Sequence, residues 1–229
     1  MTTGAGKMNR RGLAGLTVFV MMAAPVAAQD AAAHRFEIDG NAFEVPVPAG
    51  YCLPEGAALV LAEEIARLDR MNFTHANFDR CGTFGDDYVH IKTPRVSEPV
   101  NMPKSLFLPL LAREMEGAAG PQMMTDAIEE AGRTIAEDTG NAVLLGQTVP
   151  RFGGYDTDCV YVFLDANVVV GESVAVMRSA TCMTLVGRQF IAVNAYAAEQ
   201  TGTTDAQLKA RSRAVAASIR IIAEQAAQD

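Results

Sequence analysis

The chain has 229 residues, a formal net charge of −8 and a hydrophobic share of 49%. This acidity argues against nucleic acid or an anionic lipid surface as a partner. The length is sufficient for one domain with a sizeable core.

The N-terminus has the pattern of an export signal. Basic residues precede an apolar run of 12 residues, Leu13–Ala24, and small residues follow as far as Ala28. Such a run is too short to cross a bilayer, which takes roughly 20 residues. We therefore expect a signal peptide over residues 1–28, cleavage after Ala28, and one periplasmic domain over residues 29–229 with no membrane span. The general export route is favoured, and Arg10-Arg11 leaves the twin-arginine route as the alternative.

Two strands and a helix are expected next. Residues 35–47 alternate between apolar and polar side chains, which predicts two short strands joined at Asp39-Gly40-Asn41. Residues 56–72 then change to a helical period. On this helix Glu63 is expected to pair with Arg67, four residues later. Its expected apolar stripe consists of Leu61, Ile65 and Leu68.

The middle of the chain predicts further strands and two helices. Residues 76–82 and 87–93 have strand character, and the histidine before them, His75, falls in a polar loop. A proline-rich stretch leads to a helix that is expected to start at Pro109. A stronger helix runs between Pro121 and Gly140, with Glu129 facing Arg133 and an apolar stripe of Met124, Ile128, Ala131 and Ile135.

The last third of the chain predicts a three-stranded meander and a helix. A strand over Ala142–Val149 and a turn at Phe152-Gly153-Gly154 lead into it. Its second turn, Val186-Gly187-Arg188-Gln189, has the Gly-X loop of a type II′ hairpin. A first hairpin folded about Val170-Gly171 would place Cys159 directly opposite Cys182. The final helix is expected to start near Thr203-Thr204-Asp205, which has good capping chemistry.

The four cysteines, an even number in an exported chain, favour disulfides. Of the three possible connectivities we expect Cys52–Cys81 with Cys159–Cys182. Each would stabilise the fold by about 3 kcal/mol through the entropy of the unfolded chain. Zinc is the alternative, but no two cysteines have the C-x-x-C spacing of a zinc half-site.

The order of elements predicts an α+β domain, a mainly antiparallel sheet covered by helices. The segment Phe43-Glu-Val-Pro-Val-Pro-Ala-Gly-Tyr51 resembles the opening of PsbP/Mog1-like domains. The late meander, with a helix that ends in Ser218-Ile-Arg-Ile-Ile222, is similar to how those domains finish. This resemblance covers the two ends of residues 29–229 and implies an α/β/α sandwich whose members mostly bind or assist other proteins.

Candidate catalytic residues are few. Asp86, Asp87 and His90 are of types that bind several divalent ions. On a strand, however, Asp86 and His90 share one face while Asp87 points to the other. His34 is expected in a frayed terminus, without a partner.

The expected function is therefore that of a non-catalytic periplasmic domain that binds a protein or another envelope component, without a cofactor. One alternative is a hydrolase or a metal-assisted enzyme that uses Asp86, Asp87 and His90. Another is a purely structural role in the envelope.

Overall fold

The computed structural model describes residues 32–83, 85–96, 98–170 and 172–222. The expected signal peptide and Gly171 lie outside the described residues. Helices are α1 (Ala57–Leu68), α2 (Lys104–Glu116), α3 (Gly120–Asp138), α4 (Asp205–Ser218) and the short 3₁₀ helix η1 (Glu199–Thr201). Strands are β1 (Ala33–Ile38), β2 (Asn41–Pro46), β3 (Tyr51–Cys52), β4 (Asn72–Arg80), β5 (Asp87–Pro94), β6 (Val143–Tyr155), β7 (Val160–Val170), β8 (Ser173–Val186), β9 (Gln189–Ala198) and β10 (Arg220–Ile221).

The strands form two antiparallel sheets, so the α+β prediction is confirmed. The larger has seven strands in the order β3-β4-β5-β9-β8-β7-β6, and the smaller is β1-β2-β10. The predicted meander is β7-β8-β9, followed by α4. At its second turn Val186 lies opposite Gln189, and Gly187 has a φ of 62° whereas Arg188 keeps a negative φ. This is the type II′ geometry that the sequence predicted.

The first hairpin of the meander is centred one residue later than predicted. Val170 pairs with Ser173, so the residue directly opposite Cys182 is Tyr161 and not Cys159. Cys159 instead lies just before β7, where Asp156 accepts hydrogen bonds from the backbone N–H groups of Asp158 and Cys159. This turn brings Cys159 against Cys182, with 5.2 Å between their Cα atoms.

Both predicted disulfides, Cys52–Cys81 and Cys159–Cys182, are present. They indicate an oxidising, extracytoplasmic location, because reducing compartments keep such thiols free. Among the described residues no helix has the length and apolar character needed to span a bilayer.

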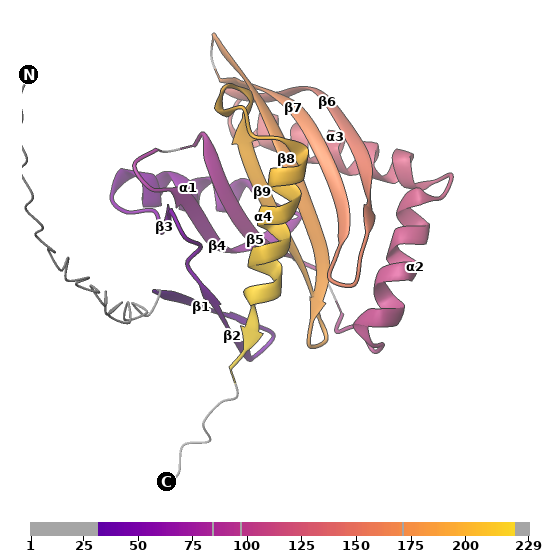
Figure 1. Ribbon diagram of the computed structural model, residues 1–229. Helices are drawn as coiled ribbons and strands as arrows, with labels where there is room; N and C mark the ends of the chain where they lie inside the picture. Colours follow the sequence, from indigo (N-terminus) through magenta and orange to yellow (C-terminus); the bar gives the residue numbers. More distant parts are fainter. Residues whose placement is uncertain (1–31, 84, 97, 171, 223–229) are drawn as a thin grey trace, which may run out of the picture. The chain divides into compact units, whose positions relative to one another are not determined.

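Helices cover the two faces of the large sheet unequally (Figure 1). Helix α4 crosses one face over β8 and β9, and its Leu208, Val215 and Ala216 belong to the main core. On the other face, α2 and α3 pack mainly on the β6 end of the sheet. There Leu108 and Ala112 bury against Val160 in a second, smaller cluster.

Helix α2 corrects one boundary. It begins at Lys104 after Pro103, so Pro109 lies inside the helix and not at its start. An internal proline removes one backbone hydrogen bond and normally disfavours a helix. Here the neighbouring Leu108 and Ala112 are buried, and this packing holds the turn around the proline together.

Strand β6 also runs further than predicted. The expected strand ended at Val149, but β6 continues through Gly153 and Gly154 to Tyr155, with a register shift after Phe152. A Cβ on Gly153 would lie 2.7 Å from the Phe163 ring of β7. The glycine therefore serves close packing within the sheet, and the turn follows it.

The ends of the domain meet in the small sheet. Arg220 and Ile221 form β10, which pairs with Glu44 and Phe43 of β2. Sequence periodicity did not separate these residues from the final helix. Helix α4 ends at Ser218, and its start matches the prediction, because Thr204 and Gln207 form a reciprocal capping box.

Candidate functional site

The three candidate catalytic residues do not converge. His90 lies on β5 between Asn77 of β4 and Asn194 of β9, on the sheet face opposite α4. Asp87 points to the α4 face, as strand alternation predicted, and accepts hydrogen bonds from Tyr51 Oη at 2.6 Å and Arg211 Nη1 at 2.5 Å. Within the described ranges, no group of three His, Cys, Asp or Glu side chains is placed to hold a metal ion.

Asp86 and Asp87 instead line a polar pocket of about 450 Å³ together with Arg80 and Arg211. Its two carboxylates and two guanidinium groups balance in charge. Asp87 already accepts hydrogen bonds from Tyr51 and Arg211. Burial and the hydrogen bond to Asp87 together raise the pKa of the Tyr51 hydroxyl. The ion pair between Asp87 and Arg211 thus joins β5 to α4 within this pocket.

A buried polar cluster surrounds His90. Burial lowers the pKa of His90 to about 3, so its ring is neutral at physiological pH. Burial also raises the pKa of Asp79, which lies two residues from Asn77 on the same sheet face. Among the described residues, His90 Nδ1, Asp79 Oδ2 and Asn77 Oδ1 are buried without a hydrogen-bond partner.

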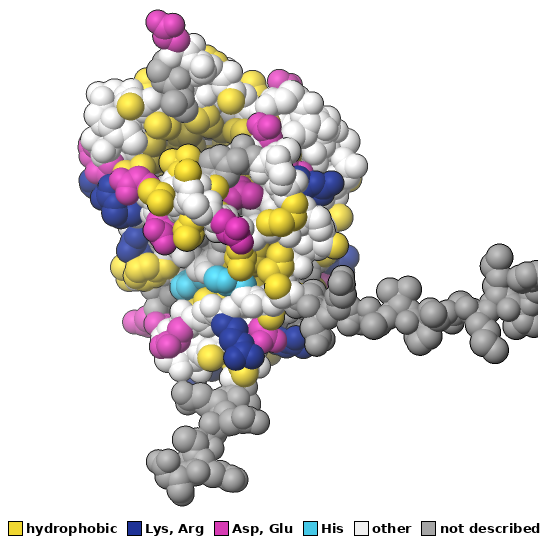
Figure 2. All heavy atoms as spheres, turned by 90° about the vertical axis from the view of Figure 1, so that its left-hand side faces the viewer, with side chains coloured by type: hydrophobic (Ala, Val, Ile, Leu, Met, Phe, Trp, Pro, Cys, Tyr) yellow, Lys and Arg dark blue, Asp and Glu magenta, His cyan; other side chains and the backbone are white. Residues whose placement is uncertain are grey.

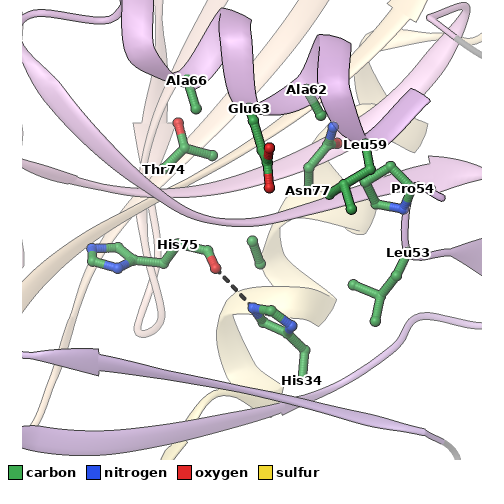
Figure 3. A pocket seen from close by; sticks show the side chains of 11 residues that line it. His34, Leu53, Pro54, Leu59, Ala62, Glu63, Ala66, Thr74, His75 and Asn77 are labelled. Carbon is green, nitrogen blue, oxygen red and sulfur yellow. Dashed lines mark hydrogen bonds between the residues drawn. The ribbon is translucent and has the colours of Figure 1, made fainter. Parts of the chain in front are cut away.

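The second pocket is a groove of about 300 Å³ along the outer edge of β4. Figure 3 shows it from close by: α1 lies above, β1 lies below, and β4 passes between them. Four consecutive β4 residues, Thr74 to Asn77, contribute to its lining. Because neighbouring strand residues point to opposite faces, such a lining means that the edge of the strand itself borders the groove. The other lining residues are His34, Leu53, Pro54, Leu59, Ala62, Glu63 and Ala66.

The edge of β4 is open because β3 is short. β3 pairs with β4 only at Tyr51–Arg80 and Cys52–Asp79. Continued in the same register, Pro54 would face Asn77, and proline has no N–H to donate to a partner strand. The sequence Cys52-Leu53-Pro54 therefore ends the ladder at the place where the groove begins.

Two histidines that the sequence analysis placed in unstructured segments lie beside this edge. His34 belongs to β1, and its Nε2 donates to the backbone carbonyl of His75 at 2.8 Å (Figure 3). His75 belongs to β4, at a register irregularity between Thr74 and Ala76. Its Nε2 lies 2.8 Å from Thr93 Oγ1, and burial lowers its pKa. Both expectations were wrong because the long-range pairing of β1 and β4 is not visible in local periodicity.

The helix that walls the groove is unusually exposed. None of the residues of α1 is buried, and the predicted stripe fails, since Leu61 and Ile65 are each almost half exposed. Leu59, which lines the groove, has an exposed fraction of 42%. Figure 2 looks onto this side of the molecule, where histidine side chains lie among hydrophobic and acidic ones.

The predicted ion pair of α1 is also wrong. Arg67 pairs with Glu64, three residues before it, at 2.6 Å and not with Glu63. In Figure 3 the Glu63 side chain extends from α1 into the groove, toward His34. No hydrogen bond or ion pair engages the Glu63 carboxylate within the described part of the chain.

Comparison with known proteins identifies no related family or curated protein. No protein-family model matches the chain, and a search of curated proteins gives no significant match.

Proposed function

We propose that this protein is a non-catalytic periplasmic domain, exported by a signal peptide cleaved after Ala28, that binds a segment of another envelope protein in the groove between α1 and β4. The observation that carries the proposal is the exposure of Leu59 on α1 and of Leu53, which line the groove with exposed fractions of 42% and 38%. An amphipathic helix normally buries its apolar face against the core, yet none of the residues of α1 is buried. These two leucines place exposed apolar surface at the groove itself, and exposed apolar surface of this kind is typical of interaction sites.

Several features support binding in preference to catalysis. The groove is mostly apolar with a few polar groups, which is the usual composition of a binding site. Of the residues proposed for a hydrolytic or metal-assisted reaction, Asp86 precedes β5 and lines a pocket together with Asp87, whereas His90 lies on the opposite face of the sheet. The resemblance to PsbP/Mog1-like domains at the two ends of the chain agrees with protein binding.

Photo-crosslinking tests the proposal. A photoreactive amino acid replaces Leu59 of α1 in one variant and Leu110 of α2 in a control variant. Both leucines are helical and about half exposed, so the two probes sample solvent equally. We expect one defined protein to crosslink from position 59 in periplasm and not from position 110. The purified partner should then lose at least tenfold in affinity for Leu59→Asp and less than twofold for Leu110→Asp.

The remaining outcomes are decisive as well. Adducts from position 59 that contain lipid or glycan and no peptide would replace the protein partner with another envelope component. Equal crosslinking from the two positions, or none from position 59, would refute the groove as the binding site. Unfolding by urea, measured for each variant, verifies that both proteins remain folded.

A further inference from the structure

We infer that the groove receives the partner as an added β-strand on β4, with a lysine or arginine of the partner paired with Glu63. This inference rests on the proposed function and specifies the chemistry of its partner.

The backbone of β4 offers hydrogen-bonding groups at the groove. The N–H of Cys81 donates to the carbonyl of Gly50, so the backbone of Cys81 faces the β3 side. Backbone groups alternate in direction along a strand, and no irregularity lies between positions 77 and 81. The N–H and C=O of Asn77 therefore point to the side where β3 has ended. An open edge of this kind is a template for a further strand, and extended peptides use such edges in recognition.

The two ends of the open edge are marked by side chains. Pro54 stops β3 at one end, next to Asn77. At the other end the His34 ring already holds the carbonyl of His75. The positions Thr74 to Asn77 span about 10 Å at the usual strand rise, which is the length of about four partner residues.

The walls decide which side chains can enter. Ala62 and Ala66 of α1 present only methyl groups, and Leu53 and Leu59 add apolar surface. Glu63 contributes the one carboxylate of this lining, and no cation among the described residues neutralises it. A partner segment that combines small or apolar side chains with one lysine or arginine complements these walls in shape and charge.

Peptide selection tests the inference directly. Random heptapeptides displayed on phage are selected on the folded protein, and the best binders are synthesised. We expect alternating apolar sequences with one Lys or Arg. Glu63→Gln should weaken their binding about tenfold, the size of one lost charge-assisted hydrogen bond. Glu64→Gln is the matched control, because that carboxylate already pairs with Arg67, and it should change binding less than twofold.

Backbone methylation distinguishes strand addition from side-chain binding. N-methyl groups on alternate residues of a selected peptide remove either the N–H groups that face β4 or those that face solvent. We expect one methylation pattern to abolish binding and the other to leave it within twofold. Slower hydrogen exchange of the Asn77 N–H in the complex provides a second readout. Equal effects of the two patterns, no enriched peptide, or equal effects of the two glutamate variants would each overturn the inference.

The experiments distinguish failure of strand addition from failure of the groove as a binding site. If a partner crosslinks from position 59 but tolerates both Glu63→Gln and loss of the edge, the binding site stands and strand addition is wrong. The variant Pro54→Val is designed to remove the open edge of β4. Valine restores a backbone N–H at position 54, so β3 can extend and pair with Asn77. We expect this variant to lose peptide binding at least tenfold.

Discussion

Helices α1 and α4 lie on the same large sheet and illustrate two different uses of an amphipathic segment. The apolar stripe of α1 is clear in the sequence, yet no residue of that helix is buried. Helix α4 is rich in alanine and arginine, yet Leu208, Ser212, Val215 and Ala216 are all buried. Hydrophobic periodicity therefore predicts which side of a helix is apolar. Whether that side is buried depends on the surface against which the helix packs.

The sharpest way to test this contrast is to truncate one leucine in each helix. Leu208→Ala in α4 removes a fully buried side chain from the main core and should destabilise the fold by about 3 kcal/mol. Leu61→Ala in α1 removes a side chain that is nearly half exposed and should lower stability by less than about 1 kcal/mol. Urea unfolding of the two variants gives both values. Similar losses would mean that α1 is as well packed as α4.

A second test compares the two faces of the sheet through acid sensitivity. The α4 face is mainly apolar, while the opposite face contains His90, whose pKa burial lowers to about 3. The unfolded chain takes up a proton on this residue near pH 6.5 and the folded chain does not, so stability falls as pH decreases below 6.5. One histidine of this kind should account for a loss of about 2 kcal/mol between pH 8 and pH 5.

His90→Gln isolates that contribution. The glutamine side chain does not titrate. The free energy of unfolding of the His90→Gln protein should therefore change less between pH 8 and pH 5 than that of the natural protein. His75, whose pKa burial also lowers, adds to the acid sensitivity in the same direction and remains in both proteins. Parallel stability curves for the two proteins would show that His90 is not the responsible group.

The smallest expected effect concerns how the two helices begin. Thr204 caps α4 through its hydroxyl, which accepts from the backbone N–H of Gln207 at 3.3 Å. Gly56 offers α1 no side-chain cap. Thr204→Ala should cost about 1 kcal/mol, and Thr204→Ser, which keeps the hydroxyl, should cost less than half of that. Thermal unfolding resolves a difference of this size, and equal melting temperatures for alanine and serine would argue against the cap.

The sequence predicted only some of the features that short segments determine. The ion pair expected between Glu63 and Arg67 was wrong, because Arg67 pairs with Glu64. The pair expected between Glu129 and Arg133 was wrong as well, because Arg133 pairs with Glu130 and Glu137. The Gly187 turn and the cap at Thr204 depend on neighbours within a few residues, and both are confirmed. The pairing of the four cysteines followed from their even number and their spacing, and it too is confirmed.

The groove could not be predicted in the same way, because it depends on residues that meet only in the fold. Pro54 matters through its register with Asn77, and His34 matters through the carbonyl of His75, 41 positions away. Glu63 lines the groove without an ion-pair partner among the described residues, because Arg67 pairs with Glu64. The one available signal was Pro54, two residues after the disulfide-bonded Cys52 of an edge strand, and it indicates a strand that stops early.

The position of α4 and β10 late in the chain has a consequence for when the core closes during synthesis. Synthesis releases a chain from its N-terminal end, so Arg220 and Ile221 emerge after the other described strands. Until α4 follows β9, the apolar residues Ile191 and Val193 have no helix to cover them. Part of the main core therefore stays uncovered until the last described segment is made, and exposed apolar surface of this kind favours aggregation.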